Sequence, residues 1–415
     1  MRDFLPADKA RREHVLGVVR DVYSRHGFDE IETPVVEDAA RLHSGLGGDN
    51  EKLAFAVMKR GLTTEDLQGA EAPLDLADLG LRFDLTVPLA RFYASHRAEL
   101  PSVFRSVQIA PVWRAERPQK GRYRQFHQID AELIGSPEPL ADVELLVMAD
   151  HLLKELGISD GVALQLNTLG DVASRDAWRA ALIEYFRAHK AELSEDSQDR
   201  LERNPLRILD SKDPRDKVFV GDAPKIDAYL SAEAQDFFAA VTAGLNAAGV
   251  AYERAPSLVR GLDYYRHTAF EFVTTRLGAQ GTVLGGGRYD GLMESLGGAA
   301  TPAVGWAAGI ERLAMLVADA GTLTEAPLTV VLAVEDDAAL GYAQKVITAL
   351  RFQGLDAEMV ATGSPRKRFD KAVKMGARVL VSFGAKDGQP SANLRAAEPT
   401  AEYLAVEQVL QSVHP

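Results

Sequence analysis

The sequence contains no cysteine among its 415 residues. This absence excludes disulfide bonds, thiolate nucleophiles and the usual structural zinc sites, and it is compatible with a reducing cytosol. No apolar stretch approaches the length of a membrane span, and no apolar signal-peptide core follows the first residues. From these absences we predict a soluble, cytoplasmic protein without a membrane partner.

Positive charge is also scarce. Lysine and arginine number 47 against 60 aspartates and glutamates, and the formal net charge is −13. A nucleic-acid partner would therefore have to meet a local basic patch. The Walker and dinucleotide-binding glycine patterns are both absent from the sequence. The glycine run Gly285–Gly287 in particular is not followed by the Lys-Ser/Thr of the Walker pattern. If the chain binds a nucleotide, we expect arginine side chains on an antiparallel sheet to hold the phosphates.

One local basic patch lies between residues 114 and 124, around Pro118 and Gly121. Its five cations are Arg114, Arg117, Lys120, Arg122 and Arg124. Alternating apolar residues at 107–113 and 126–134 predict two strands joined by this Pro/Gly turn. Forked guanidinium groups suit phosphate oxygens, which favours a polyphosphate or nucleic-acid ligand. A solvated basic loop is the alternative.

Two pairs of polar residues could line a pocket. Gln128 and Glu132 are four residues apart, so on the second predicted strand they share one face. Asp84 and Thr86 are two apart, so on a strand they would face the same side and could bind an amino group together. A helix that begins near Val87 with one of them as its cap explains the second pair equally well.

Three more arginines lie beside glycines, where the backbone can approach a ligand closely: Arg260, Arg288 and Arg312. A surface ion pair would explain each one singly. Together with the basic hairpin they favour an anionic ligand.

The pattern of the chain predicts two domains. Amphipathic helices are expected at 7–26, 141–156 and 224–248, and residues from about 171 to 222 resemble an insertion. The segment 28–36 reads as a strand interrupted by Pro34, so we expect it either to lie at a sheet edge, where two subunits could meet, or to break at that proline. After Pro327, strands alternate with helices, which indicates a small α/β domain with a largely parallel sheet. Its helix 365–375 carries five cations that either solvent or a nucleic acid could meet.

These stretches together resemble the histidyl-tRNA synthetases, a family of class II aminoacyl-tRNA synthetases, over nearly the whole chain. Arg-Gly-Leu-Asp-Tyr-Tyr at 260–265 and Gly-Gly-Gly-Arg-Tyr-Asp-Gly at 285–291 carry the specific likeness. The general class II motifs correspond to Pro34, to Arg-Ala-Glu at 114–116 and to Gly-Ile-Glu-Arg at 309–312.

The resemblance implies a fold and a domain division. We expect an α+β catalytic domain over 1–322, with a mixed, mainly antiparallel sheet and a helical insertion at about 171–222. An α/β anticodon-binding domain is expected over 326–415. The resemblance also implies a homodimer, with the edge strand near Pro34 at its interface.

The implied activity is a two-step ligation: L-histidine and ATP give histidyl-adenylate and pyrophosphate, and histidine then passes to the 3′ end of tRNA(His). Arg114 and Arg260 would contact the α-phosphate as catalytic groups. The expected ATP contacts are Arg114, Glu116, Arg122 and Arg312, with Mg²⁺ on the pyrophosphate. The expected histidine contacts are Asp84, Thr86, Gln128, Glu132, Tyr265 and Tyr289. The hairpin tip would meet the tRNA acceptor end through Arg117, Gln119 and Lys120.

Some positions depart from the family pattern. Met1 directly precedes Arg2-Asp3, where a Gly-Thr pair is usual, and Asp84-Leu-Thr86 replaces the Glu-Gly-Thr of many bacterial members. His127 and His267 are expected to be structural, because the adenylate phosphate can serve as the base. Two rival functions are a histidine-sensing regulatory paralogue, which typically lacks the C-terminal domain and loses the arginines, and an adenylating ligase that does not act on tRNA.

Overall fold

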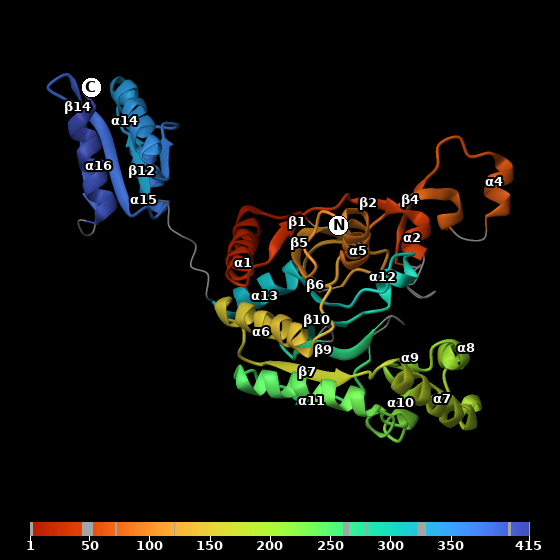
Figure 1. Ribbon diagram of the computed structural model, residues 1–415. Coiled ribbons are helices and arrows are strands. Elements are labelled where there is room, and N and C mark those ends of the chain that lie inside the picture. The colour runs from red at the N-terminus through yellow and green to blue at the C-terminus, as the bar shows by residue number, and fades with distance from the viewer. Residues whose placement is uncertain are drawn as a thin grey trace. The chain divides into compact units, whose positions relative to one another are not determined.

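The computed structural model describes most of the chain, namely residues 3–43, 53–70, 73–119, 121–259, 265–278, 281–321, 329–396 and 400–414. The chain divides into two compact units, Met1–Leu323 and Thr324–Pro415 (Figure 1). No helix within the described residues is long and apolar enough to cross a membrane.

The first unit is built on an eight-stranded sheet in the order β1-β5-β6-β11-β10-β9-β7-β8. The strands, in that order, are Asp29–Ile31, Phe104–Trp113, Gln125–Ile134, Ala303–Gly309, Thr282–Arg288, Arg266–Thr274, Val162–Thr168 and Glu253–Arg254. The outermost pair at each edge is parallel, and the pairs between them are antiparallel. The predicted mixed, mainly antiparallel sheet is confirmed.

The strands β5 and β6 form the predicted hairpin. Val107 lies opposite Ala131 and Trp113 opposite Gln125. At the tip, the backbone N–H groups of Gln119 and Arg122 each donate to the carbonyl of the other residue, at 3.0 and 2.9 Å. Gly121 closes this turn with a φ of 74°, which a residue with a side chain rarely adopts.

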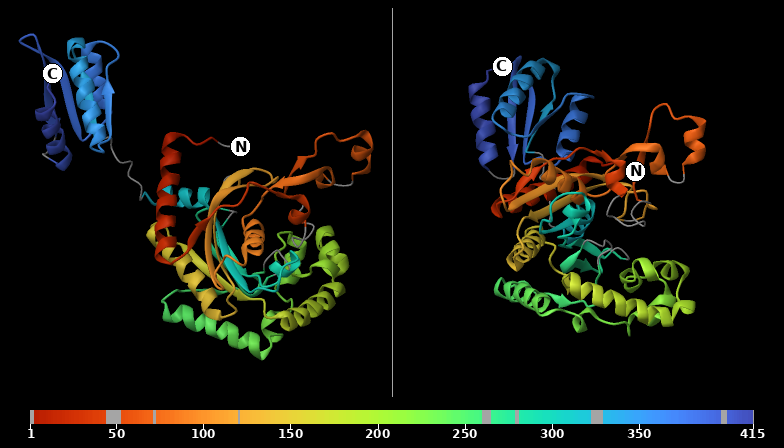
Figure 2. Two further views of the ribbon diagram at one scale, coloured as in Figure 1. Left: turned by 45° about the horizontal axis from the view of Figure 1, so that its top comes forward. Right: turned by 45° about the vertical axis from the view of Figure 1, so that its right-hand side comes forward.

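Four helices cover one face of the sheet: α1 (Pro6–Arg25), α6 (Pro139–Glu155), α11 (Ala232–Ala247) and α13 (Ile310–Ala320). In Figure 2 they follow the outer side of the curved sheet. The helix α1 buries Val15, Val19 and Val22, whose three- and four-residue spacing places them on one side of the helix. They pack in one core with sheet residues such as Val107 and Ile129.

The other face of the sheet carries α5 (Thr86–His96), α12 (Leu292–Ser295) and the helices of the insertion. The insertion comprises α7 (Val172–Ala188), α8 (Glu195–Arg203), α9 (Leu206–Leu209) and α10 (Pro214–Val220). Their apolar side chains share a second core with Phe104 and Ile134 of the β5–β6 hairpin. The inner face of the sheet is therefore covered by α5, α12 and the insertion helices.

A small three-stranded sheet, in the order β2-β4-β3, accompanies the large one. Its strands are Val36–Asp38, Ala77–Leu81 and Phe55–Met58, and the short helices α2 (Ala39–His43) and α4 (Thr64–Gly69) lie nearby in the sequence. The strand expected over 28–36 breaks around Pro34, one of the two outcomes predicted for that proline, and its two halves β1 and β2 belong to different sheets. In the segment that joins β1 to β2, the carbonyls of Thr33 and Pro34 accept hydrogen bonds from the buried guanidinium of Arg82, at 2.7 and 3.1 Å. The expected edge position holds for β1.

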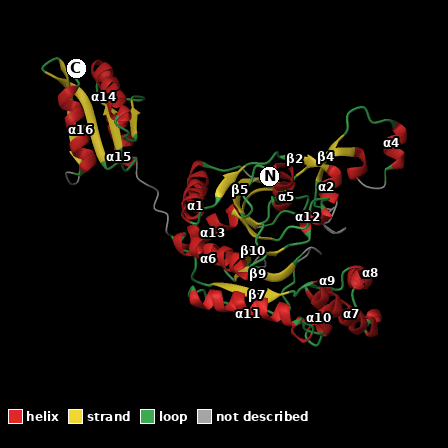
Figure 3. Cartoon of the chain, in the orientation of Figure 1, coloured by secondary structure: helices red, strands yellow, loops and turns green. Residues whose placement is uncertain are grey.

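The second unit has four strands in the order β13-β12-β14-β15, with bounds Ala357–Val360, Val330–Val334, Val379–Lys386 and Gln389–Ala396 (Figure 3). The central strand β12 pairs in parallel on both sides, as predicted. It is apolar throughout because both of its faces are covered. The helices α14 (Leu340–Phe352) and α16 (Ala401–Ser412) pack on one face, and α15 (Pro365–Lys374) packs on the other.

Candidate active site

A cavity opens on the inner face of the large sheet. Its walls come from the hairpin loop, from β6, β10 and β11, and from the start of α13. All four predicted ATP contacts line it (Arg114, Glu116, Arg122 and Arg312), and so does Gln128 from the predicted histidine group.

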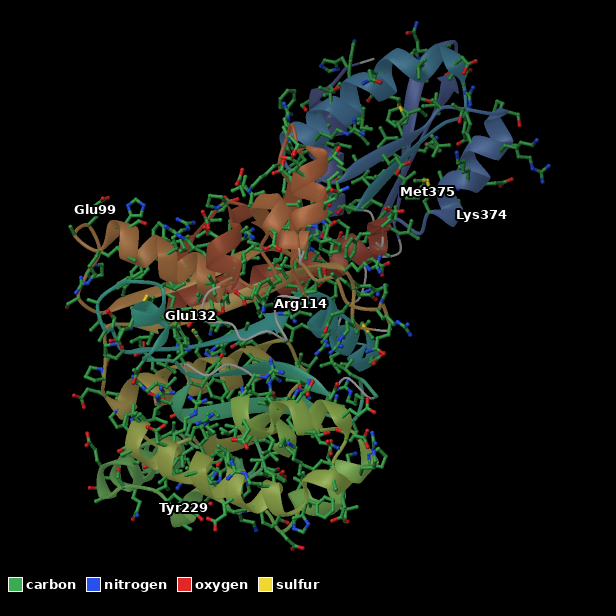
Figure 4. The ribbon with its side chains drawn as sticks, turned by 90° about the vertical axis from the view of Figure 1, so that its right-hand side faces the viewer. Glu99, Arg114, Glu132, Tyr229, Lys374 and Met375 are labelled. Carbon is green, nitrogen blue, oxygen red and sulfur yellow. The ribbon has the colours of Figure 1, made fainter. Side chains whose placement is uncertain are left out.

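Arg114 is fixed from several sides. Its Nε donates to the carbonyl of Phe83 at 2.9 Å, and its guanidinium lies 5.1 Å from the centre of the Phe126 ring. Burial lowers the pKa of Arg114, while the neighbouring Asp84 carboxylate acts in the opposite direction. Figure 4 labels Arg114 and Glu132, which both lie in the interior of the first unit.

Arg122 and Arg312 complete a cluster of three cations. Arg122 pairs with Glu116 at 3.2 Å. Arg312 donates to the carbonyls of Gly121 and Thr282, at 3.0 and 2.6 Å. Burial, followed by repulsion from Arg122 and Arg114, lowers the pKa of Arg312. The arrangement is therefore costly until an anion enters, which is the property expected of a phosphate site.

The predicted histidine contacts gather beside this cluster, around the buried carboxyl of Glu132. The hydroxyl of Tyr289 donates to Glu132, and the Thr86 side chain also bonds to it. The rings of Tyr265 and Tyr289 meet edge to face, 6.3 Å apart. A Cβ at position 305, directly opposite Glu132 on β11, would overlap the Glu132 carboxyl and force it to move.

Glu132 and the residues around it, which include Asp84, Thr86 and Tyr289, are called the acidic pocket because two of them are carboxylic acids. Burial raises the pKa of Glu132 to about 8, although hydrogen bonds from Tyr289 and Thr86 act against that rise. Burial also raises the pKa of Asp84, against the opposing effect of Arg114. An acidic pocket next to a cationic one suits a ligand with an ammonium group at one end and phosphates at the other.

Asp84 and Thr86 do not lie on a strand. Thr86 is the first residue of α5, and Asp84 Oδ1 accepts the backbone N–H of Val87 at 3.3 Å. The alternative, a polar residue at the start of a helix, describes this segment. Both side chains nevertheless face the acidic pocket, since Thr86 bonds to Glu132 and Asp84 interacts with Arg114.

Two predicted site residues, Arg260 and Lys120, lie outside the described residues. Their companions at the hairpin tip, Arg117 and Gln119, are exposed. Arg288, which we grouped with ligand-binding arginines, is instead completely buried. It pairs with Asp142 of α6, with Nε at 3.0 Å from a carboxyl oxygen, and donates to the carbonyl of Ser136. These contacts tie β10 to α6 and support the fold.

Both histidines considered earlier have structural contacts. The backbone N–H of His127 donates to the Glu311 carboxylate at 3.0 Å, and its ring Nδ1 lies 3.4 Å from the same group. The ring of His267 stacks on Phe237, with 4.2 Å between centres.

Sequence reasoning missed some residues of the site. Glu311 lines the cavity, and its carboxylate binds the backbone of β6, which ties α13 to that strand. It belongs to the motif at 309–312, in which only Arg312 was predicted to contact a ligand. Asp130 faces the same side as Gln128 and Glu132, and the two-residue alternation along β6 was the available signal. In the part of the chain that is described, no cluster of histidine, aspartate and glutamate could by itself hold a metal ion.

The chain is similar to known proteins over nearly all of its length. Residues 1–313 match the family model described as histidyl-tRNA synthetase. A histidine–tRNA ligase of Novosphingobium aromaticivorans is 59% identical over 407 residues, which are 97% of this chain and 94% of the relative. One from Gluconacetobacter diazotrophicus is 47% identical and aligns over 92% of this chain and 89% of its own. The crystal structure of apo S. aureus histidyl-tRNA synthetase superposes with a TM-score of 0.74 at 26% identity, over 99% of this chain and 98% of that one.

Proposed function

The chain belongs to the histidyl-tRNA synthetase family, and from this premise we propose how its residues divide the work. The protein is a ligase that uses ATP to attach histidine to tRNA. One observation carries the assignment of roles: the cation cluster and the acidic pocket share a boundary. Gln128 lines the cavity, and Asp84 of the acidic pocket interacts with Arg114 of the cluster. The two substrates of the first step would meet at this boundary.

In the first step, the carboxylate of histidine attacks the α-phosphorus of ATP and pyrophosphate leaves. Two anions must approach each other, so fixed cations lower the barrier by relieving repulsion and stabilising the transition state. We assign the α-phosphate to Arg114 and Arg260, and the terminal phosphates to Arg122 and Arg312. The backbone bonds of Arg114 and Arg312 hold their guanidinium groups in place before ATP arrives.

The acidic pocket would hold histidine by both ends. The Oε1 atom of Gln128 is buried, and no donor in the described structure reaches it. Such an acceptor suits the α-ammonium group, with Asp84 and Thr86 as its other partners. The Glu132 carboxylate would accept an imidazole N–H, with Tyr265 and Tyr289 beside it. A site built on hydrogen bonds strongly rejects analogues that lack them.

Mg²⁺ on the pyrophosphate is part of this proposal. Magnesium bound to phosphates needs only one or two protein carboxylates and otherwise keeps water. Glu116 lines the cavity, and Glu271 accepts a hydrogen bond from the cavity residue Thr282 at 2.9 Å. These oxygen donors fit the ion, which would neutralise the leaving pyrophosphate.

We assign tRNA(His) to two surfaces. The exposed tip residues Arg117 and Gln119, with Lys120, would meet the acceptor end, and residues 326–415 would bind the anticodon. On α15, Arg366, Lys367, Lys371 and Lys374 are exposed and available to phosphates. Arg368 is not, because it is buried and donates to the carbonyls of Val334 and Gly363. Binding should weaken steeply with salt.

A homodimer is the proposed assembly, with its interface along β1 and the small sheet. The strand β1 is the edge of the large sheet. On the small sheet, Val57 and Leu79 lie opposite each other and are 39% and 40% exposed, and Val36 is 39% exposed. Exposed apolar side chains gathered on one face of a sheet suit a second copy of the chain. The tRNA substrate and the lack of cysteine agree with a cytoplasmic location.

The decisive experiment measures histidine-dependent exchange of pyrophosphate into ATP, followed by charging of tRNA(His). We expect both activities in the wild type. Arg260→Ala should lower exchange roughly a thousandfold, because one fixed donor to a transition-state anion contributes about that much. Arg187→Ala, which removes a surface pair with Glu202, is the control. Undiminished exchange in Arg260→Ala would overturn that assignment, and tight histidine binding without any exchange would favour the regulatory paralogue.

A further inference from the structure

Asp130 is a carboxyl group that the proposed reaction leaves without a task. It lies in the middle of β6, between Gln128 and Glu132 on the same face of the strand, and it is completely buried. Neither of its oxygens is reached by a hydrogen-bond donor from the described residues. An ionised carboxyl buried in this way would be very costly, so its state requires an explanation.

The residues opposite Asp130 on the neighbouring strands make no hydrogen bond to its carboxyl. Opposite it on β5, Gln108 already donates its amide nitrogen to Thr33 at 2.7 Å, and its amide oxygen makes no bond. Opposite it on β11 is Ala307, which has no polar side chain. No side chain opposite Asp130 therefore bonds to its carboxyl, and a proton on Asp130 or on Glu132 would let the two carboxyls bond to each other.

Other titratable groups around Asp130 act in the same direction. Glu132 lies on β6, Asp84 precedes α5, Tyr289 follows β10 and Tyr23 lies on α1. Burial, followed by the charges of Glu132 and Asp84, raises the pKa of Asp130 well above its usual range. The side chains of Asp130 and Glu132 are close enough to share a hydrogen bond, which requires one proton between them.

We propose that Asp130 is neutral at physiological pH and donates its carboxyl proton to Glu132, which makes it a positioning residue for histidine recognition. Glu132 is then the carboxyl of the pair that ionises first, because hydrogen bonds from Tyr289, Thr86 and Asp130 favour its charged form. One of its lone pairs remains for the imidazole N–H. The two carboxyls together present a single negative charge to the amino acid. This inference rests on the proposed role of Glu132 in reading the imidazole.

Two substitutions of Asp130 distinguish the loss of its hydrogen-bond donor from the loss of its ability to ionise. Asp130→Asn keeps the shape and a donor but has no proton to lose, so kcat/KM for histidine in the exchange reaction should stay within about threefold at pH 7. Asp130→Leu keeps a branched side chain and removes the donor, so the same constant should fall about tenfold, as for a lost bond to a charged group. Asp150→Asn, in a surface pair with Lys154 on α6, is the matched control.

The pH profile gives the readout that a purely structural role would not change. Above the pKa of Asp130, which burial and the charge of Glu132 raise, both carboxyls ionise and kcat/KM for histidine should fall about tenfold per pH unit in the wild type. Asp130→Asn should lack this fall. Any fall caused by the amino group of free histidine is common to both enzymes. Identical profiles, or a loss in Asp130→Asn as large as in Asp130→Leu, would overturn the proposal.

A second measurement needs neither activity nor a variant. Carbon-13 NMR of wild-type protein labelled at its aspartate and glutamate carboxyls should show a group that is still protonated at pH 7. Complete ionisation of every carboxyl at pH 7 would overturn the proposal even if Asp130→Asn failed to fold. A protonated carboxyl in a protein without exchange activity would instead contradict the proposed function and leave the protonation of Asp130 in place.

Discussion

The guanidinium of Arg312, at the start of α13, donates from Nε to the carbonyl of Gly121 at the tip of the β5–β6 hairpin, at 3.0 Å. A second donor of the same group binds the carbonyl of Thr282 on β10, at 2.6 Å. One side chain thus joins the hairpin, a central strand and a helix around the cavity. A phosphate site assembled in this way depends on the fork of arginine and not only on its charge.

Arg312→Lys should therefore weaken ATP use although the charge is kept. We expect kcat/KM for ATP to fall roughly ten- to a hundredfold, since bonds to a charged group contribute about 1.5–3 kcal/mol, with a smaller change for histidine. Pyrophosphate exchange under varied ATP measures this. Arg276→Lys is a matched control, because Arg276 also binds two backbone carbonyls, those of Asp160 and Leu316. Equal losses in the two variants would show that the fork acts only through stability.

Gly305→Ala should damage histidine recognition specifically. The new Cβ would overlap the Glu132 carboxyl, which must then move. Displacement of a recognition group by about 1 Å can cost roughly a hundredfold, so we expect a loss of that order in kcat/KM for histidine. The histidine and ATP constants should be measured side by side. Gly341→Ala, at a helix position where a Cβ meets nothing within 4 Å, should leave both unchanged, and wild-type histidine kinetics in Gly305→Ala would contradict the geometry.

Asp142→Leu should destabilise the protein strongly. It would leave the buried guanidinium of Arg288 without its carboxylate, and breaking a buried pair from one side costs about 3–5 kcal/mol. The double variant Asp142→Leu/Arg288→Met removes both charges and should recover most of that loss. Urea unfolding gives the free energies. Glu202→Gln, in the exposed pair with Arg187, should cost less than about 1 kcal/mol. A double variant no more stable than Asp142→Leu would contradict the buried-pair account.

His26 should make stability depend on pH. Its ring lies 3.0 Å from that of His151, and burial, followed by the charge of His151, lowers the pKa of His26 below the ordinary 6.5. The unfolded chain therefore takes up this proton at a higher pH than the folded chain does. The free energy of unfolding should fall as pH drops below about 6.5 and level off below the folded pKa.

His26→Gln should flatten this part of the stability curve, measured by urea unfolding between pH 7.5 and about 5. The exposed His14→Gln serves as the control. An unchanged slope in His26→Gln would assign the acid sensitivity to other groups.

Local patterns predicted much of this fold. The β5–β6 hairpin and the helix α1 follow from alternation and helical spacing, because each buries a single face. The division at Pro34 was harder, since the sequence does not say that the chain changes sheets there. The strand β15 was missed because Gln389–Ala396 is mostly polar and pairs along one side only.

The site shows the limit of local reasoning more clearly. Gln128 and Glu132 were placed correctly on one face because both lie on one strand. Arg288 was misjudged because its partner Asp142 lies 146 residues away, and no local pattern indicates that contact. For the same reason, the fit of Gly305 against Glu132 becomes visible only when β6 and β11 are aligned.

The three guanidiniums around the cavity also affect what leaves it. Because these cations repel one another, binding of a polyanion of suitable size between them is favourable, whether it is a substrate or a product. In the reaction we propose, pyrophosphate would depart against the same attraction that draws ATP in. In a reaction that runs in both directions, removal of the free product by the surroundings, and not by the enzyme, sets the direction of flow.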